Sequence, residues 1–469
     1  MKKYNFSIEQ IDITELSKFQ KKLMNMVDYT DLYVEEVVGL SWYLGLTERV
    51  GPFLSSKRGA GLRLKVNQKN NQIYICKTLA EYKNIYELFE TASKKLLSNK
   101  IWDTNSQTKN NYFTSQNNSL YCKFGLPYKE ANSYFDNLEK FARNEVNLYD
   151  LSCHISGSLK KVIILDRKGT VREWVESKLK TKINLIFNIE GELITKTKKS
   201  FSRSNNIDFK ELILKNGFDL VKEVKKYSKL KFVKPNQLDL ILASGAGGIL
   251  IHEACGHALE ADAIIDNDSI LSKMWGKKVA PDFITIADRG DLKGDWVYEP
   301  YDSEGTLSKP VYLIKNGIVD GIMTDIRTAK KLNLKSTGNG RRESYQFQPI
   351  CRMRNTYVEP GIYSPEEIIK DTKKGIYATE FSGGEVNTQT GDFIFGINSG
   401  FFIENGEITE AIKPFLYAGN TLDILSKIDV IGNDLKFEIG DCGKNGQMVD
   451  VSYGQPTLRI SSQKIGGSR

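Results

Sequence analysis

The chain of 469 residues lacks the features that mark membrane and secreted proteins. Its longest apolar runs, such as residues 162–165 and 238–243, are far too short to cross a bilayer, so no membrane partner is expected. Its six cysteines show no paired spacing, which indicates free thiols rather than a disulfide framework. Residues 1–6 lack the continuous apolar stretch of a secretory signal. Together these absences predict a cytoplasmic protein.

A large excess of charge of one sign is also missing. Lysine and arginine number 66 against 58 aspartates and glutamates, a net charge of +8. The basic residues cluster at 196–199 and 222–234, and such runs usually form a solvated face. No zinc-finger, RNP-like or helix-turn-helix pattern accompanies them. Nucleic acid is therefore not an expected partner, and a nucleic-acid regulator is a rival interpretation that would require binding that collapses with salt.

The length of the chain predicts two domains. Apolar residues at helical spacing follow Thr14 and recur over 82–96, from Pro127 to 141 and over 209–224, with alternating strands at 32–46 and 62–66. From residue 158 onwards hairpins are expected, with turns at 168–169, 190–191, 316–317 and 405–406. We place the boundary in the Lys-rich stretch 222–234, after which the chain is mostly antiparallel strand interrupted by one helix.

Histidine is scarce, and its distribution is informative. The chain has only three, His154, His252 and His257, and two of them enclose Glu253 in the hexapeptide His-Glu-Ala-Cys-Gly-His. Two histidines with a glutamate between them are typical of a metallopeptidase helix, in which the imidazoles bind zinc and the carboxylate is the base. The glycine-rich turn at 244–248, just before, lacks the order of a phosphate-binding loop and is discounted as one.

The spacing of the two histidines is unusual for such a helix. Five residues advance a regular helix by about 500°, which would splay the two rings by roughly 140°. Both can face one ion only if the helix is locally widened or ends early. Gly256 is where such a bulge would cost least, so we predict an irregular helix at residues 254–257.

A catalytic zinc needs three protein ligands and one open position. The residues alone leave the third ligand open among five candidates, which are His154, Cys255, Glu260, Asp262 and Cys442. Cys442 lies in a glycine-flanked loop at 440–446 that could bring its sulfur close to a metal. Cys255 is more easily explained as a small buried residue on the other face of the helix.

Several blocks in the same order resemble the TldD/PmbA family of metallopeptidases, also called the modulator-of-gyrase family. Residues 252–262 resemble its TldD-type H-E-x-x-x-H motif, and further similar blocks lie at 338–345, 352–357, 381–393 and 442–447. The resemblance covers nearly the whole chain and is densest after residue 236. PmbA-type members lack the metal motif, so this chain resembles the catalytic TldD type.

The resemblance implies that Zn²⁺ is bound by His252, His257 and Cys442, and that Glu253 is the catalytic base. It implies an α+β protein: an N-terminal α/β domain (residues 1–230) and a β-rich antiparallel C-terminal domain (231–469) carrying one metal-binding helix. It also implies hydrolysis of unfolded or extended peptides, and a homodimer or a heterodimer with a metal-free relative. The alternative is a non-enzymatic, zinc-containing peptide-binding or regulatory subunit.

Two finer expectations concern the substrate. A donor near the metal would stabilise the oxyanion, and Arg341, Arg342 or Tyr345 could supply it, although structural roles are at least as reasonable for each. The substrate backbone is expected to pair with an exposed strand edge, a mode that recognises extension more than side chains.

Overall fold

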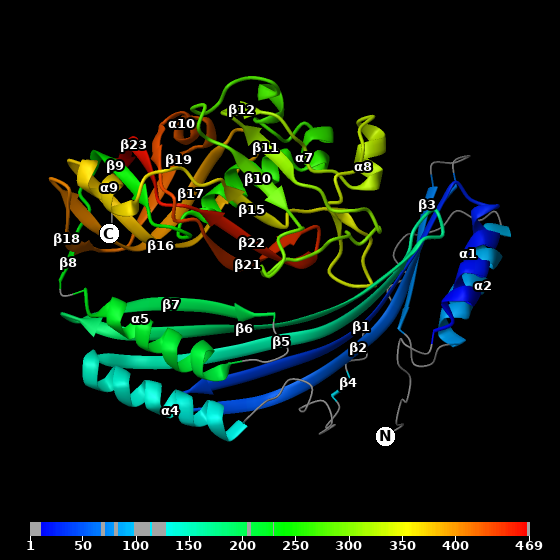
Figure 1. Ribbon diagram of the computed structural model, residues 1–469, viewed down its shortest axis with the longest axis horizontal. Helices are drawn as coiled ribbons and strands as arrows, with labels where there is room; N and C mark the ends of the chain where they lie inside the picture. Colours follow the sequence, from blue (N-terminus) through cyan, green and yellow to red (C-terminus); the bar gives the residue numbers. More distant parts are fainter. Residues whose placement is uncertain are drawn as a thin grey trace.

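A computed structural model describes residues 11–66, 71–78, 83–97, 113–114, 128–203, 208–227 and 229–466. A long curved sheet from the N-terminal half lies beneath a body of shorter strands and helices from the C-terminal half, and its concave face is turned towards that body (Figure 1). No helix in the described part of the chain combines the length and apolarity needed to span a membrane.

Seven of the described strands form the N-terminal sheet, in the order β3-β2-β1-β5-β6-β7 with β4 paired to β2. They are β1 (Tyr29–Gly45), β2 (Arg49–Val66), β3 (Asn71–Thr78), β4 (Phe113–Thr114), β5 (Leu148–Leu165), β6 (Val171–Ile189) and β7 (Glu192–Ser202). Every pairing within this sheet is antiparallel. Such long strands alternate side chains between two faces, one apolar and one polar.

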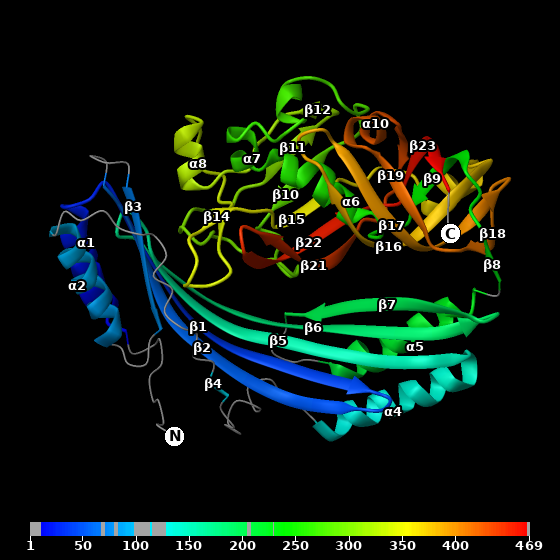
Figure 2. The same cartoon turned by 180° about the vertical axis from the view of Figure 1, so that it is seen from behind.

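The helices of the N-terminal half cover the apolar face of this sheet. They are α1 (Ile13–Met24), α2 (Lys83–Leu97), α4 (Tyr128–Glu145) and α5 (Asn216–Val224), which continues a π-helical segment, Lys210–Lys215. Helices α4 and α5 lie under the convex side, and α1 and α2 pack at the far end (Figure 2). All four predicted helical segments are confirmed, although Tyr82 and Pro127 lie outside the described residues.

The C-terminal half holds three further sheets among its described residues. The larger two have the orders β20-β23-β9-β16-β17-β18-β8, with β19 on β17, and β12-β11-β10-β15-β22-β21; β13 and β14 form a small pair. The strands of the first are β8 (Leu230–Lys231), β9 (Asn236–Leu242), β16 (Lys374–Val386), β17 (Asp392–Glu404), β18 (Glu407–Ile412), β19 (Phe415–Asn420), β20 (Ile428–Ile431) and β23 (Leu458–Ile465).

The remaining elements complete this half. The second sheet contains β10 (Ile286–Arg289), β11 (Val311–Lys315), β12 (Ile318–Val319), β15 (Asn355–Val358), β21 (Lys436–Lys444) and β22 (Gln447–Gln455), and the pair is β13 (Gly340–Arg341) and β14 (Ile350–Cys351). The helices are α6 (Gly248–Ile251), α7 (Ala261–Ile265), α8 (Ile326–Lys331), α9 (Pro365–Asp371) and α10 (Thr421–Ser426). One large apolar core fills the space between the two sheets and α6.

The α+β class and the four hairpins are confirmed, but the fold differs from the prediction in two respects. The N-terminal half is not α/β in the strict sense, because its strands are antiparallel. The C-terminal half is not purely antiparallel and carries more than one helix: β9 pairs with β16, β15 with β22, and β8 with β18 in parallel. These parallel partners are far apart in sequence, and residue alternation carries no information on strand direction.

Ion pairs and one close ring contact join the two halves. Arg63 pairs with Asp31 on its own sheet and with Glu304 from the C-terminal half at 2.6 Å, all with buried side chains. The ring of Tyr345 lies directly on Gly59, where a Cβ atom would come within 2.3 Å of three ring carbons. The division at residues 230 and 231 stays a prediction, since β8 spans it and pairs with β18.

We expect Gly59→Ala to destabilise the protein. The added methyl would overlap the ring of Tyr345, which is 1% exposed and has little room to move. Overpacking of this kind costs about 1–3 kcal/mol, measurable as a lower free energy of unfolding in urea. Gly383→Ala is the matched control, because nothing lies within 4 Å of a Cβ atom there. Equal stability of the two variants would contradict the assigned contact.

Candidate metal centre

The motif helix begins at a tight approach between two segments. Gly248 opens α6, and a Cβ atom on it would lie 2.9 Å from the backbone of Tyr453 and Gly454 on β22. The glycine-rich turn at 244–248 therefore lets the helix lie against the strand. This packing accounts for the turn without a phosphate.

The helix changes geometry where the two histidines lie. Residues His252–Gly256 form a π-helical turn, in which the N–H of His257 donates to the carbonyl of His252, and His257–Leu259 form a 3₁₀ turn. Hydrogen bonds between residues five apart bring those residues onto one face. The two imidazole centroids lie 5.1 Å apart with their planes at 84°. The predicted irregularity at 254–257 is confirmed.

Gly256 has a different purpose from the one predicted. Its backbone is in the ordinary right-handed helical region, with φ −62° and ψ −62°, so the turn does not need the conformational freedom of glycine. A Cβ atom at this position would instead lie 1.9 Å from the sulfur of Met353, which is fully buried. Glycine is required here for space.

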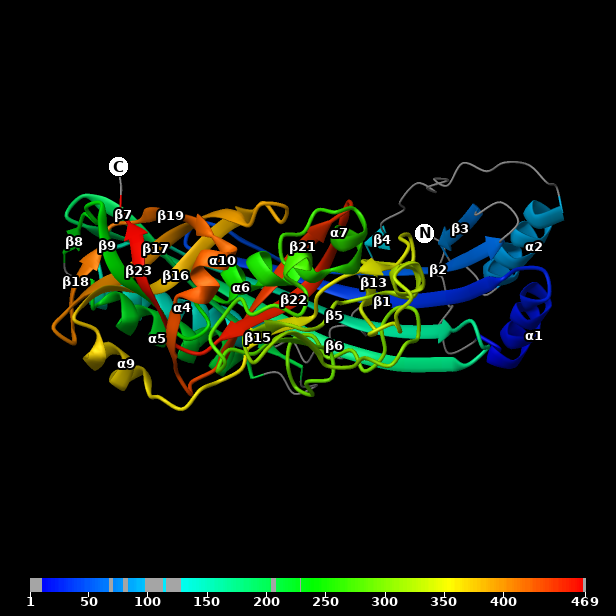
Figure 3. The same ribbon diagram turned by 90° about the horizontal axis from the view of Figure 1, so that it is seen from above.

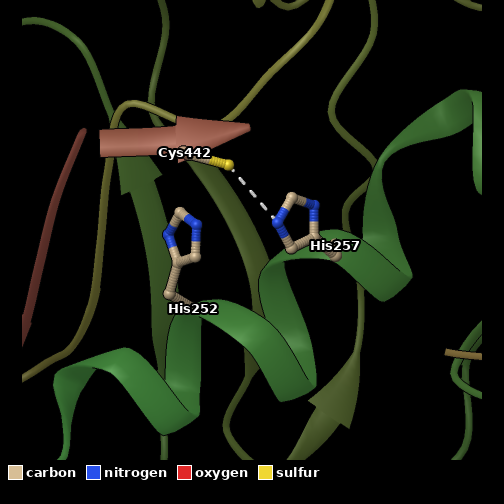
Figure 4. Close-up of side chains that lie close together, drawn as sticks. All are labelled: His252, His257 and Cys442. Atoms are coloured by element: carbon tan, nitrogen blue, oxygen red, sulfur yellow. Dashed lines mark hydrogen bonds between the residues drawn. The ribbon is translucent and has the colours of Figure 1, made fainter. Parts of the chain in front are cut away.

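Cys442 reaches the histidines from the hairpin of β21 and β22. The hairpin turns at Asn445 and Gly446, both with positive φ. Cys442 Sγ lies 3.4 Å from Nε2 of His257, a residue 185 positions away in the sequence. The ligand atoms of His252, His257 and Cys442 all lie within 4.8 Å of one another (Figure 4).

The other candidates for a third ligand lie elsewhere or have other contacts. His154 is exposed on β5 in the N-terminal sheet, outside this group. Cys255 is buried in the apolar core, and burial raises its thiol pKa to about 12. Glu260 and Asp262 both accept hydrogen bonds from Lys444. The structure therefore brings Cys442 to the histidines, as the family resemblance implied.

The three side chains fit a metal ion. Zinc bonds of about 2.0–2.1 Å to nitrogen and about 2.3 Å to sulfur place tetrahedral donors about 3.3–3.6 Å apart. The three atoms here lie within 4.8 Å of one another, so the group has to close on the ion. Nδ1 of His252 is buried without a hydrogen-bond partner in the described structure. Burial raises the pKa of Cys442, but hydrogen bonds and charges of the two imidazoles outweigh it and bring that pKa to about 4. A thiolate at neutral pH is the form that binds a metal.

Glu260 orients the second histidine. Its Oε2 lies 2.9 Å from Nδ1 of His257, and the side chain is 1% exposed. Burial raises the pKa of Glu260, but His257 and Lys444 lower it to about 2. An ionised carboxylate can only accept, so Nδ1 must carry the proton. Burial lowers the pKa of His257, but Glu260 and Cys442 raise it well above its ordinary value, so Nε2 also holds a proton towards Cys442. A metal bound at Nε2 would replace that proton.

Lys444 connects this pair to the hairpin. Its Nζ donates to Glu260 and Asp262, both at 2.7 Å, and to the carbonyl of Cys351 at 3.2 Å. Lys444 lies two residues after Cys442, so one short segment supplies both a candidate metal ligand and the cation that holds Glu260. Lysine is too common for the sequence to have singled it out.

Glu253 has a more open position than Glu260. Its Oε2 lies 3.7 Å from Nε2 of His257, and its side chain is 27% exposed. It therefore lies beside the donor group without belonging to it. A carboxylate in this position can exchange a proton with water or a substrate next to the metal.

The predicted oxyanion donors are committed to other contacts. Arg341 donates to both oxygens of Glu299 and to the carbonyl of Met353. Arg342 is buried over the ring of Tyr33, and Tyr345 packs on Gly59. Tyr453 also lies at the candidate site, with its ring centroid 5.9 Å from that of His252. It could not be recognised as a site residue from the sequence, because an aromatic residue on a strand is usually part of the core.

Comparisons with known proteins show which family the chain resembles. Residues 235–467 match the model of the PmbA/TldA metallopeptidase C-terminal domain. The Metalloprotease TldD homolog of Buchnera aphidicola subsp. Schizaphis graminum is 30% identical over 466 residues, which cover 94% of this chain and 93% of that protein. The Zinc metalloprotease TldD homolog of Saccharolobus solfataricus is 32% identical over 315 residues, covering 66% of this chain and 65% of that protein.

A solved structure has the same fold. TldE from Thermococcus kodakarensis superposes with a TM-score of 0.76 and covers 97% of this chain and 100% of its own, at 18% identity. The family model and the curated relatives define a metalloprotease. Within that class the chain belongs to the TldD/PmbA family, which confirms the resemblance found in the sequence.

We expect Glu260→Gln to weaken zinc binding by about 10- to 100-fold, because the amide no longer fixes the proton on Nδ1 of His257. Competition with a chromophoric chelator measures the affinity directly and independently of any activity. Asp262→Asn is the control, since Asp262 shares Lys444 but does not contact His257. If both variants weakened binding equally, the role would belong to Lys444 rather than to the histidine contact.

Proposed function

We propose that this protein is a zinc-dependent peptidase that hydrolyses unfolded or extended peptides. His252, His257 and Cys442 would be the zinc ligands and Glu253 the general base. The main support is the arrangement itself: three donors within 4.8 Å of one another and a carboxylate 3.7 Å from one of them. The name of the Saccharolobus relative supports zinc as the metal.

Zinc bound by these residues would supply a Lewis acid that polarises the scissile carbonyl and makes water acidic enough to lose a proton near neutral pH. Glu253 accepts that proton at Oε2 and later delivers it to the leaving amine. Glu260 keeps a proton of His257 on Nδ1, so that Nε2 would be the nitrogen that binds the metal. The thiolate of Cys442 offsets part of the positive charge of the metal.

The number of donors favours catalysis over a structural role. Structural zinc sites are usually closed by four protein ligands, whereas catalytic sites keep one position open. Within the described part of the chain, no fourth histidine, cysteine, aspartate or glutamate joins the group. A structural site would also have no use for the half-exposed Glu253. These observations weigh against the non-enzymatic peptide-binding subunit, which remains the second candidate.

The strand that carries Cys442 offers a place for an extended substrate. Strand β21 is at the end of its sheet and pairs only with β22 among the described strands. An unpaired edge presents backbone groups to which a peptide can add as a further strand. We propose that the substrate lies along this edge, so that its backbone passes the metal.

Two further proposals rest on the sequence. One is a cytoplasmic location, which the unpaired spacing of the cysteines favours. The other is a dimer, either of two identical chains or with a metal-free relative. The similarity to TldE concerns the fold and does not decide between the two forms.

We expect Glu253→Gln to lower cleavage of an unfolded test polypeptide by at least about 100-fold at equal zinc occupancy, because the proton acceptor is lost. Mass spectrometry of the fragments measures both rate and cleavage sites. Glu407→Gln, at an exposed position on β18, should cleave like the unaltered protein.

Two other results would change the interpretation. Equal cleavage by the Glu253 variant would show that the activity comes from another site or a contaminant. Absence of cleavage by every preparation, with zinc bound, would favour the binding subunit or a requirement for a partner.

A further inference from the structure

The concave face of the N-terminal sheet is polar and basic where it faces the C-terminal body. On β6 the alternate residues Leu179 and Ile183 enter the apolar core under α4 and α5. Lys178, Lys180 and Lys182 occupy the intervening positions and therefore point to the opposite, concave side. The view from above shows the C-terminal body over this part of the sheet, away from α1 and α2 (Figure 3).

A row of three basic side chains crosses this face. Lys182 on β6 is directly opposite His154 on β5 and Lys199 on β7 in the antiparallel register. Directly opposite residues point to the same face with their Cβ atoms about 5 Å apart. Ser41 from β1 adds a hydroxyl 3.4 Å from Nε2 of His154. We call His154, Lys182 and Lys199 the basic row.

The basic row lies next to the strand that carries Cys442. Nζ of Lys199 donates to the carbonyl of Ile439 on β21 at 3.1 Å. Nζ of Lys180 contacts both carboxylate oxygens of Asp441 at 3.1 Å, one residue before Cys442. The basic row therefore borders β21 at Ile439, where Lys199 already occupies one backbone carbonyl.

Carboxylates neutralise most of the lysines on this face, but not Lys182 at its centre. Lys178 pairs with Asp450 and Lys180 with Asp441. Glu438 and Asp441 are the acidic groups whose charges act on Lys199. Lys182 is exposed, and in the described part of the chain no carboxylate is within ion-pair distance of it. Lys182 and Lys199 are like charges placed opposite one another, an arrangement that is unfavourable until an anion joins them.

The pKa values of His154 and Lys199 agree with a positive potential around Lys182. Burial lowers the pKa of His154, and the charges of Lys180 and Lys182 lower it further. Burial also lowers the pKa of Lys199, and Lys182 and Lys180 add to this against Glu438 and Asp441. The positive charge of Lys182 therefore lowers the pKa of both residues opposite it, His154 and Lys199.

We propose that the basic row binds a carboxylate of the peptide substrate. This inference rests on the proposed function, since it places the carboxylate on a peptide lying along β21. Ile439 is three residues from Cys442, and a strand rises about 3.3 Å per residue, so the carboxylate would be about 10 Å from the metal centre. It would belong to an acidic side chain about three residues from the cleaved bond, or to the C-terminus of the peptide.

The test measures binding rather than turnover. Unfolded fluorescent peptides that differ only by Glu or Gln at one position, each with a free or amidated C-terminus, are titrated into the zinc-loaded Glu253→Gln protein. We expect the acidic peptide to bind about threefold to fivefold more tightly, as suits an exposed ion pair. Lys182→Glu should abolish or reverse this preference. Lys168→Glu, the same charge change in the exposed turn between β5 and β6, should leave it unchanged.

Each outcome separates the two proposals. Tighter binding of peptides with a free C-terminus than of amidated ones identifies the C-terminal carboxylate. Tighter binding of Glu peptides than of Gln peptides identifies a side chain. Equal binding of all peptides, or a preference that survives Lys182→Glu, would overturn the basic row. Selective binding together with no cleavage by the unaltered protein would keep the basic row and reject the peptidase. Cleavage by the unaltered protein without charge selectivity in binding would keep the peptidase and reject the basic row.

Discussion

The contact of Lys444 with Glu260 holds together the two segments that supply the candidate metal ligands. The helix brings His252 and His257, and the hairpin brings Cys442; nothing in their local sequences sets the distance between them. Lys444 makes the connection with two hydrogen bonds to carboxylates and one to a carbonyl. Because Glu260 is buried, its charge would be costly without this partner. The same cation thus stabilises the fold and sets the orientation of His257.

A set of buried arginines extends this constraint through the C-terminal half. Arg352 donates to the carbonyls of Cys442 and Gln447, and so fixes both strands of the hairpin. Arg354 pairs with Asp288, with both side chains fully buried. Removing one member of such a pair leaves an uncompensated charge, which typically costs about 3–5 kcal/mol. Within the motif block at 352–357, Arg352 therefore supports the hairpin that carries Cys442.

Local signals in the sequence predicted local structure well. The Asn-Gly turns at 316–317 and 405–406 adopt the positive φ that their residue types favour. The five-residue spacing of the histidines predicted the π-helical turn, because no regular helix can turn both rings to one ion. What could not be predicted depends on distant partners. Whether Glu260 binds the metal or orients His257 is decided by Lys444, 184 residues away, and the need for Gly256 is decided by Met353.

The two halves of the chain meet at the edge strand β21, which the C-terminal half provides and the N-terminal sheet contacts. An unpaired strand edge beside a metal centre can accept a substrate strand, but it can equally accept a strand from any other chain. The C-terminal half alone would leave this edge open. The N-terminal sheet approaches it through Lys180 and Lys199, which contact Asp441 and the carbonyl of Ile439. These contacts come from side chains of the polar concave face and add no strand to β21. The long antiparallel sheet therefore borders the strand that carries Cys442.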